Sequence, residues 1–297
     1  MKNRWAKAGE NIILQNERLR VEIAYPGTFY RGSRFDWTGF ITRITLDGRH
    51  DFCVPERFEP GKGTGGAGLC NEFGIKTPVG YDDAGVGEQF PKLGTGLLRK
   101  KSEEPYDFFT PYEVEPFPIF VTADESNACF KVEPAECRGY AVRLQKTVSV
   151  RDNALIIDYK LGNAGGKPIF TTEYCHNFLG IDGHKIGREY SLSFPRKVKA
   201  DRLVGSFISY DDKILWEETP QGDFYGKIEA GTPDLPWQWQ LLHEPSGAGV
   251  RETSRLPVSE FILWGCGHAV SPELMIEISL EPGGLMSWTR EYEFFCR

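Results

Sequence analysis

Residues 140–161 read YAVRLQKTVSV, RDN and ALIIDYKL in succession. In the first and third runs apolar residues alternate with polar ones, the pattern of side chains that point to opposite faces of a strand. The middle triplet contains the turn-forming residues Asp152 and Asn153. The stretch therefore predicts a hairpin of two antiparallel strands.

The rest of the chain shows the same pattern. Alternating or β-rich runs recur along it, among them RVEIAY (20–25), FITRITLDG (40–48), FKVEPAE (130–136), YSLSF (190–194), WQWQLL (237–242) and EFILWG (260–265). Helical periodicity is scarce, and aromatic residues make up 13% of the chain, which suits a sandwich core. We therefore expect an all-β protein, a single large antiparallel β-sandwich domain over residues 1–297 with few short helices. The segment 56–118, rich in Gly, Pro and Asp, is expected to form loops that decorate one face and wall a site.

Composition limits the classes of partner. The net charge of −7 argues against a nucleic-acid partner. No apolar run approaches the ~18 residues of a membrane-spanning helix, and the N-terminus has no apolar signal segment. The seven cysteines are odd in number, scattered and without a C-x-x-C pair, which is typical of free thiols in a reducing cytoplasm. We expect a cytoplasmic protein without a nucleic-acid or membrane partner, and the sequence leaves its oligomeric state open.

Four familiar motifs are absent or lack their context. GTGGAG (63–68) matches G-x-G-x-x-G, but no strand pattern precedes it and no helix pattern follows it, so it indicates a flexible loop. The five histidines show no H-x-H or H-E-x-x-H spacing, and G-x-S-x-G is absent. Asp182 and His184 share one apparent turn, as metal ligands or as part of a solvated turn. We expect no metal and no nucleotide cofactor.

One predicted strand, TTEYCHNFLGIDGH (171–184), is unusually polar. Alternation places on one face Thr172, Tyr174, His176 and Phe178, and on the other Glu173, Cys175 and Asn177. His176 then lies among aromatic residues near a strand end, either as a hydrogen-bonded core histidine or as an acid–base group.

A second strand, SPELMIEISLEPGG (271–284), brings carboxylates to one sheet face. Its apolar face consists of Leu274, Ile276, Ile278 and Leu280, and its other face of Glu273, Met275, Glu277, Ser279 and Glu281. Glu281 is expected to face solvent. Glu273 follows Ser-Pro at the predicted strand entrance and can point into a cleft where loops converge.

Several stretches together resemble the galactose mutarotase (aldose 1-epimerase) superfamily, in particular a branch of uncharacterised bacterial epimerase-like proteins. They are TEYCHNFLGIDG (172–183), SRFDWTGFITRITLDG (33–48), GLCNEFGI (68–75) with FPKLGTGLL (90–98), and SPELMIEISLEPGG followed by TREYEF (289–294). Their order covers nearly the whole chain. The resemblance implies a large antiparallel β-sandwich that holds a small-molecule sugar on a concave sheet face and needs no cofactor.

The same resemblance implies the interconversion of sugar anomers, with His176 as the acid and Glu273 as the base. Both side chains are expected on one concave face, with their tips about one pyranose ring apart, and Glu277 remains the competing carboxylate. The family usually carries a second, earlier histidine, but this chain has none between His50 and His176. Asn71, Lys76 and Lys92 are the candidates to replace it.

Further side chains are candidates to bind the sugar. Trp37 and Tyr174 offer flat apolar faces, and Arg34 could donate to hydroxyl groups or instead pair with Asp36. Lys76 and Lys92 are either sugar contacts or surface residues. Two further tryptophans, Trp237 and Trp239, are interpreted as core.

Two other classes of function stay open. One is a non-catalytic carbohydrate-binding or sensing protein on the same fold. The other is a different sugar-active enzyme, such as a lyase or an epimerase of phosphorylated sugars, which a cluster of Arg34, Lys76 and Lys92 would favour.

Overall fold

The computed structural model describes residues 4–5, 9–229, 236–255 and 257–297. Within these residues the regular elements are strands, labelled β1–β24, and no helix occurs, so the all-β prediction is confirmed and the few short helices are absent from the described part. None of the described residues belongs to a helix with the length and hydropathy needed to span a bilayer.

Two large sheets contain most of the described strands. The first has 11 strands in the order β1 (Arg4–Trp5), β10 (Ile119–Ala123), β11 (Asn127–Val132), β12 (Val142–Arg151), β13 (Ala154–Asn163), β24 (Leu285–Cys296), β21 (Ala248–Ser254), β20 (Trp237–His243), β15 (Tyr190–Ser193), β18 (Lys213–Leu215) and β17 (Ile208–Tyr210). The second has 10 strands in the order β16 (Lys199–Val204), β19 (Phe224–Glu229), β22 (Glu260–Cys266), β23 (Ala269–Leu280), β14 (Ile169–Phe178), β6 (Gly68–Phe73), β4 (Phe40–Leu46), β3 (Leu19–Ala24) and β2 (Ile12–Gln15), with β5 (His50–Asp51) beside β4. All the described ladders are antiparallel.

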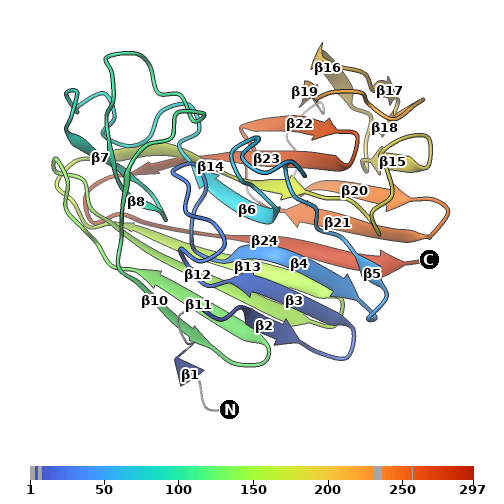
Figure 1. Cartoon of the computed structure of the whole chain (residues 1–297), viewed down its shortest axis with the longest axis horizontal. Helices are drawn as coiled ribbons and strands as arrows, with labels where there is room; N and C mark the ends of the chain where they lie inside the picture. The colour runs from blue at the N-terminus through green and yellow to red at the C-terminus, as the bar shows by residue number, and fades with distance from the viewer. Residues whose placement is uncertain (1–3, 6–8, 230–235, 256) are drawn as a thin grey trace.

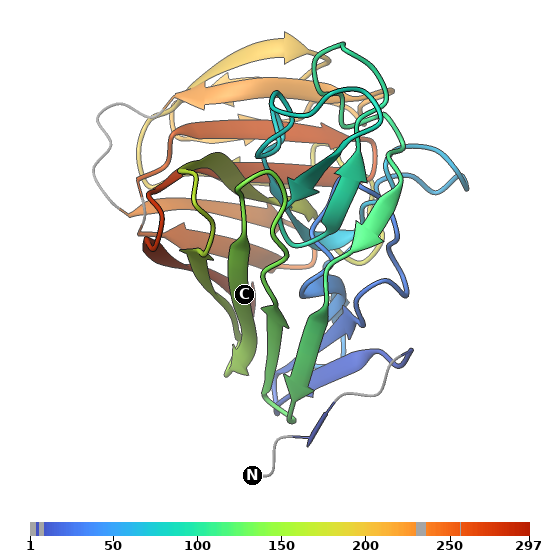
Figure 2. The same ribbon diagram turned by 90° about the vertical axis from the view of Figure 1, so that its left-hand side faces the viewer.

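A small third sheet consists of β7 (Gln89–Lys92), β8 (Gly96–Arg99) and β9 (Val114–Pro116). Figure 1 places β7 and β8 with their long loops at the upper left and β16–β19 at the upper right, and Figure 2 shows the same parts from the side. The segment 56–118 thus holds not only loops but also this sheet and β6, a strand inside the second large sheet.

The hairpin predicted for residues 140–161 is present as β12 and β13. Its register runs from Val142 opposite Asn163 to Arg151 opposite Ala154, so the turn consists of Asp152 and Asn153 alone. Asp152 has a φ of 52°, a left-handed conformation that aspartate tolerates better than most residues.

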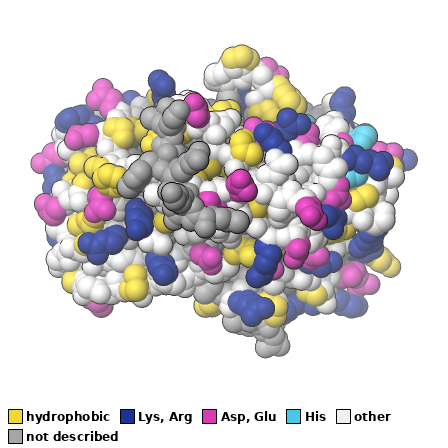
Figure 3. All heavy atoms as spheres, turned by 90° about the horizontal axis from the view of Figure 1, so that it is seen from below, with side chains coloured by type: hydrophobic (Ala, Val, Ile, Leu, Met, Phe, Trp, Pro, Cys, Tyr) yellow, Lys and Arg dark blue, Asp and Glu magenta, His cyan; other side chains and the backbone are white. Residues whose placement is uncertain are grey.

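The hydrophobic core lies between the two large sheets. It combines side chains of β23, such as Ile276 and Ile278, with side chains of β24, such as Tyr292 and Phe294. Trp239 is fully buried in this core and Trp237 nearly so, as interpreted from the sequence. On the outside, acidic and basic side chains are interspersed over the face seen in Figure 3.

Candidate functional site

A cavity of about 850 Å³ lies on the outer face of the second large sheet, the face turned away from the core. It is lined by Arg34, Glu56, Arg57, Lys62, Gly63, Ile75, Lys76, Tyr106, Asp107, Phe108, Phe109, His176, Asp223, Tyr225, Glu260, Ile262, Trp264, Glu273 and Met275. Strands β14, β19, β22 and β23 supply one side, and loops of the segment 56–118 supply another.

The side chains of β14 alternate as the sequence predicts. His176 reaches the cavity, whereas Cys175 belongs to the core between the sheets. Glu173 and Asn177 also point inward, since Glu173 bonds to Arg290 and Asn177 accepts from the Tyr292 hydroxyl at 3.1 Å.

Pro272 explains why β14 and β23 part beside His176. The ladder between these strands runs from Ile169 to Glu173, is interrupted beside His176, and resumes at the bridge between Leu179 and Val270. Pro272 has no N–H and cannot donate to a neighbouring strand. Side chains fill the gap instead: the Asn177 backbone N–H donates to Ser271 Oγ at 2.8 Å, and Asn177 Nδ2 donates to the Pro272 carbonyl at 2.6 Å. β23 itself begins at Ala269, so Glu273 lies inside the strand rather than at its entrance.

His176, Glu273 and Ser271 form a closed group of three side chains. His176 Nε2 lies 3.3 Å from Glu273 Oε1. Ser271 Oγ donates to Glu273 Oε1 at 2.8 Å and lies 3.0 Å from His176 Nδ1. Because the serine hydrogen is used on Glu273, Oγ can only accept from the ring. Nδ1 therefore carries the ring proton of neutral His176, and Nε2 presents a lone pair toward Glu273.

Aromatic side chains fix the orientation of the His176 ring. Phe178 stacks on it with the ring centroids 3.9 Å apart. Phe35 and Trp264 pack against it edge to face, with centroid distances of 5.9 and 5.2 Å. A Cβ at position 66 would lie 2.3 Å from the Phe178 ring, so glycine at this position lets Phe178 support the histidine.

Burial shifts both members of the pair toward their uncharged forms. Burial, with a smaller contribution from the Arg34 charge, lowers the pKa of His176 well below its usual value. Burial raises the pKa of Glu273 to about 8, although Ser271 and Arg34 act in the opposite direction. Near pH 7 the histidine is therefore neutral and the glutamic acid holds the proton.

Glu72 of β6 is a buried carboxylate that accepts hydrogen bonds from two cations and one hydroxyl group behind the cavity. Its Oε2 accepts from Arg34 Nε at 2.9 Å and from the Tyr174 hydroxyl at 2.6 Å. Its Oε1 accepts from Lys92 Nζ at 3.0 Å. Burial alone would raise the pKa of Glu72, but Lys92 and Arg34 outweigh it and lower that pKa.

The structure brings together part of the residues singled out in the sequence. Four line the cavity: Arg34, Lys76, His176 and Glu273. Tyr174 and Lys92 lie behind it, both fully buried, so the Tyr174 ring offers no face for stacking. Glu277 shares the outer face but is solvent-exposed beyond the cavity.

Asn71 and Trp37 are not among the cavity residues. Asn71 points between the sheets, because it alternates with Glu72 on β6. It donates to Glu173 at 2.7 Å and accepts from Lys146 at 2.9 Å. The Trp37 indole donates to the Gly32 carbonyl at 2.9 Å and packs beside Gly27.

One further expectation is wrong, and one of the two alternatives left open for Arg34 is not found. The His176 and Glu273 tips do not stand one pyranose ring apart but touch, because Ser271 bonds to both. Arg34 pairs with Glu72 rather than with Asp36, which is held by Lys146 Nζ at 2.7 Å.

Sequence reasoning missed the groups that hold the pair in place. Ser271 stands two residues before Glu273, so the alternation that assigns Glu273 to the outer face also assigns Ser271 to it. Glu72 is a charged residue in the otherwise apolar stretch GLCNEF and adjoins the chosen Asn71. Trp264 faces the cavity opposite Ser271 in the β22–β23 register, which the sequence does not specify.

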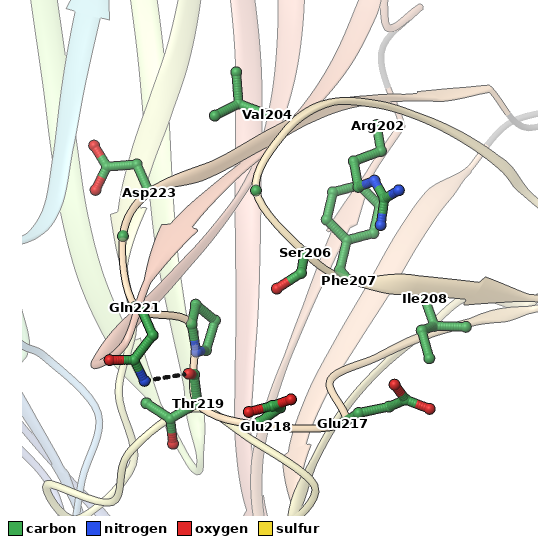
Figure 4. A pocket seen from close by; sticks show the side chains of 13 residues that line it. Arg202, Val204, Ser206, Phe207, Ile208, Glu217, Glu218, Thr219, Gln221 and Asp223 are labelled. Carbon is green, nitrogen blue, oxygen red and sulfur yellow. Dashed lines mark hydrogen bonds between the residues drawn. The ribbon is translucent and has the colours of Figure 1, made fainter.

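A second hollow of about 610 Å³ lies nearby and shares Asp223 with the first. Figure 4 shows the side chains that line it, from residues 202–208 and 217–223, with Gln221 donating to the Thr219 carbonyl at 3.1 Å. Its lining residues include no histidine. It therefore lacks the acid–base pair that distinguishes the larger cavity.

Metal ligands do not gather in the described part of the chain, where no group of three or more His, Cys, Asp or Glu side chains could hold an ion. Asp182 instead bonds to His50 Nδ1 at 2.7 Å, and His184 stacks on His243 with centroids 4.2 Å apart. All seven cysteines are free thiols.

The arrangement of the sheets is shared with known structures. A protein of Synechocystis sp. PCC 6803 is similar over 98% of this chain and 97% of its own, with a TM-score of 0.64 and 15% identity. A galactose mutarotase related enzyme of Lactobacillus acidophilus is similar over 96% and 97%, with a TM-score of 0.62 and 10% identity. The chain has the galactose mutarotase-like fold.

A homologue of the aldose epimerases from C. elegans shows the same fold, with a TM-score of 0.56, 14% identity and coverage of 97% of this chain and 99% of its own. No protein-family model and no curated protein matches the sequence. The likeness at 10–15% identity establishes the fold, as the resemblance of the sequence stretches implied. The chemistry has to be argued from the side chains.

Proposed function

We propose that the protein is an aldose 1-epimerase-type enzyme, which interconverts the α and β anomers of a free sugar. One observation carries the proposal: an imidazole and a carboxyl group in direct contact, His176 Nε2 and Glu273 Oε1 at 3.3 Å, in the wall of a cavity on a galactose mutarotase-like fold.

The reaction needs an acid and a base near one carbon atom. The base removes the proton of the anomeric hydroxyl, the C1–O5 bond breaks as the C1–O1 carbonyl forms, and the acid protonates O5. Rotation about C1–C2 and reclosure of the ring then give the other anomer. Because O1 and O5 are both bonded to C1, two groups in contact with each other can serve both oxygens from one side.

The protonation states favour Glu273 as the acid and His176 as the base in the resting protein, the reverse of the roles expected from the sequence. Glu273 holds its proton because burial raises its pKa to about 8. His176 is neutral, and its Nε2, 3.3 Å from Glu273 Oε1, carries the lone pair that can accept a proton. One proton enters His176 as another leaves Glu273, so the site gains no net charge. Ring closure in the opposite sense restores the starting states.

Arg34 is the proposed anchor for sugar hydroxyl groups. Its side chain lines the cavity and is held by Glu72, Thr64 and Tyr174 at 2.9, 3.2 and 3.0 Å. A guanidinium has five N–H donors, so two remain for a ligand. The Phe108 ring packs on the Arg34 guanidinium, with Arg34 Cζ 4.1 Å from the ring centroid, and this contact restricts the movement of the guanidinium.

Exchange NMR or polarimetry over a panel of free aldoses tests the proposal. The wild type should accelerate anomer exchange of at least one sugar, and His176→Asn should lower that acceleration by ~10²–10⁴-fold, the usual contribution of a positioned acid–base group. Absence of acceleration with every sugar, by protein shown to be folded, would contradict the proposal.

A further inference from the structure

One side of the cavity, next to the acid–base pair, is apolar. This apolar wall consists of Ile75, Tyr225, Ile262 and Met275, which pack together over the buried ring of Tyr174. Ile262 and Met275 are 5% and 4% exposed, so the surface they keep is the part that lines the cavity. Except for the Tyr225 hydroxyl, the wall offers no side-chain hydrogen-bonding group.

The sheet register fixes this wall beside the carboxyl group. Ile262 lies directly opposite Glu273 in the β22–β23 ladder, and Met275 is the next residue of β23 on the same face. Charged groups further along are engaged with one another, since Glu260 accepts from Lys76 at 3.1 Å and from Lys227 at 3.0 Å.

The position of the apolar wall beside the acid–base pair limits which part of a bound sugar can contact the wall. With O1 and O5 at the acid–base pair, the neighbouring ring atoms are C2 and C5. C2 of an ordinary aldose carries a hydroxyl group directly on the ring. C5 carries C6, which becomes a methyl group when its single oxygen is absent.

We propose that the enzyme prefers 6-deoxy sugars, whose C6 methyl group lies against the wall of Ile75, Tyr225, Ile262 and Met275. This substrate class rests on the proposed anomer exchange at the same site. A methyl group there buries apolar surface against Ile75, Ile262 and Met275, whereas a hydroxymethyl group loses water and finds no partner among the side chains of the wall other than the Tyr225 hydroxyl. An apolar pocket rejects an added hydroxyl only moderately, so the preference should be about tenfold to hundredfold in kcat/KM.

Matched sugars measure the preference. Galactose, glucose and mannose are each compared with their 6-deoxy counterparts, in the D and the L series, by exchange NMR. Saturation-transfer NMR of the same sugars with His176→Asn protein reports binding when the chemistry is blocked. We expect faster exchange of at least one 6-deoxy sugar than of its parent, and the strongest transfer to its methyl group.

Each outcome bears on a different claim. Equal exchange within all pairs, or preference for the hydroxylated member, overturns the substrate class and leaves the proposed function standing. Faster exchange of 2-deoxy than of 6-deoxy counterparts overturns it too, because C2 would then meet the wall. If no sugar is exchanged but a 6-deoxy sugar binds more tightly than its parent, the proposed function fails and the binding preference stands. If neither binds, both fail.

A variant of the wall tests the mechanism of selection. Ile262→Thr keeps the branch at Cβ, removes Cδ1 and replaces Cγ1 with a hydroxyl group, so the ratio of kcat/KM for a 6-deoxy sugar to that for its parent should fall toward one. Ile75→Thr, at a half-buried position, makes the same change with less risk to folding. Ile208→Thr, on β17 outside the cavity, is the matched control and should keep the full preference. An unchanged preference in both wall variants overturns the assignment of these residues.

Discussion

The two faces of the sheet at β14 and β23 bury carboxyl groups in opposite ways. On the inner face Arg290 donates to Glu173 at 2.9 Å and to Glu252 at 2.8 Å. On the outer face Glu273 contacts Ser271 and His176, and no Lys or Arg side chain of the described residues lies within 4 Å of it.

The difference is between carboxylates that stabilise the fold through ion pairs and a carboxyl group that has no cationic partner and can exchange its proton. A buried carboxylate with a cationic partner stays ionised and is costly to disturb. A buried carboxyl group without one keeps its proton at neutral pH and can give it to a ligand. The sheet thus carries the ion-paired Glu173 on its inner face and, at β23 on its outer face, a carboxyl group that keeps its proton, whereas Glu72 at β6 on that outer face is ion-paired.

The largest effect on activity should follow from a change at Glu273. Glu273→Gln removes the transferable proton, so kcat for anomer exchange should fall by ~10²–10⁴-fold with a smaller change in KM. The free energy of unfolding should stay unchanged or rise, because no ion pair is lost. Glu277→Gln, at an exposed position on the same strand, is the control. A large defect from Glu277→Gln with a mild one from Glu273→Gln would move the role to Glu277.

The largest effect on stability should come from the other face. Glu173→Gln leaves Arg290 with one carboxylate partner, and breaking such a buried pair costs about 3–5 kcal/mol. Urea unfolding measures the loss, and kcat per folded molecule should stay within a few-fold of the wild type. A cost below about 1 kcal/mol would mean that the two faces do not differ as described.

A smaller effect is expected in the pH dependence of stability. Because the folded pKa of Glu273 is about 8 and lies above the unfolded value, the folded state binds the extra proton and stability falls as pH rises toward 8. His176 has a lowered folded pKa and acts in the opposite sense, but only below about pH 6.5. The window from pH 6.5 to 8 therefore isolates Glu273. Unfolding free energies should decline across it in the wild type and decline less in Glu273→Gln, and parallel curves would contradict the raised pKa.

Ser271→Ala should have a still smaller effect. It removes the hydroxyl that orients both His176 and Glu273, and loss of a hydrogen bond of this kind lowers kcat about tenfold to hundredfold. Because Ser271 lowers the pKa of Glu273, the pH–rate limb due to that group should also move upward in the variant. A purely structural role for Ser271 would change the rate without moving the limb.

Chelation should have no effect on activity. The acid–base pair needs no metal for the proposed chemistry, and the described residues form no cluster suited to one. Exhaustive treatment with EDTA should leave the exchange rate unchanged. Loss of activity that a divalent ion restores would show that proton transfer alone does not explain the reaction.

The fold was largely predictable because alternation is a local signal. The hairpin of β12 and β13 and the two faces of β14 follow from the order of polar and apolar residues alone. His176 and Glu273 followed from the same signal combined with the family resemblance. In GLCNEF, however, two adjacent polar residues, Asn71 and Glu72, compete for the outer face, and alternation does not say which of them faces the core.

Contacts between distant segments were beyond sequence reasoning. Tyr174 was assigned to the correct face, but its hydroxyl bonds to Glu72 and Arg34 and its ring is buried against Ile262 and Met275. His176 and Glu273 lie opposite each other because the register that pairs Glu173 with Ile276 is the same one that pairs Leu179 with Val270 beyond the gap. Such distances depend on how strands pair and separate, which the pattern of one strand does not contain.

The carboxylate of Glu72 also couples the local unfolding of the segments that contact it. Arg34, Lys92 and Tyr174 reach it from three segments far apart in the chain, and Lys92 belongs to the small sheet of β7–β9. Local unfolding of that sheet would remove Lys92 from the buried Glu72 carboxylate and expose Arg34 to water. Amide hydrogens of β6, β7 and β14 should therefore exchange with solvent together, as one cooperative unit. The small sheet then behaves as a fixed support for the segment between β8 and β9, whose residues Tyr106–Phe109 line the cavity.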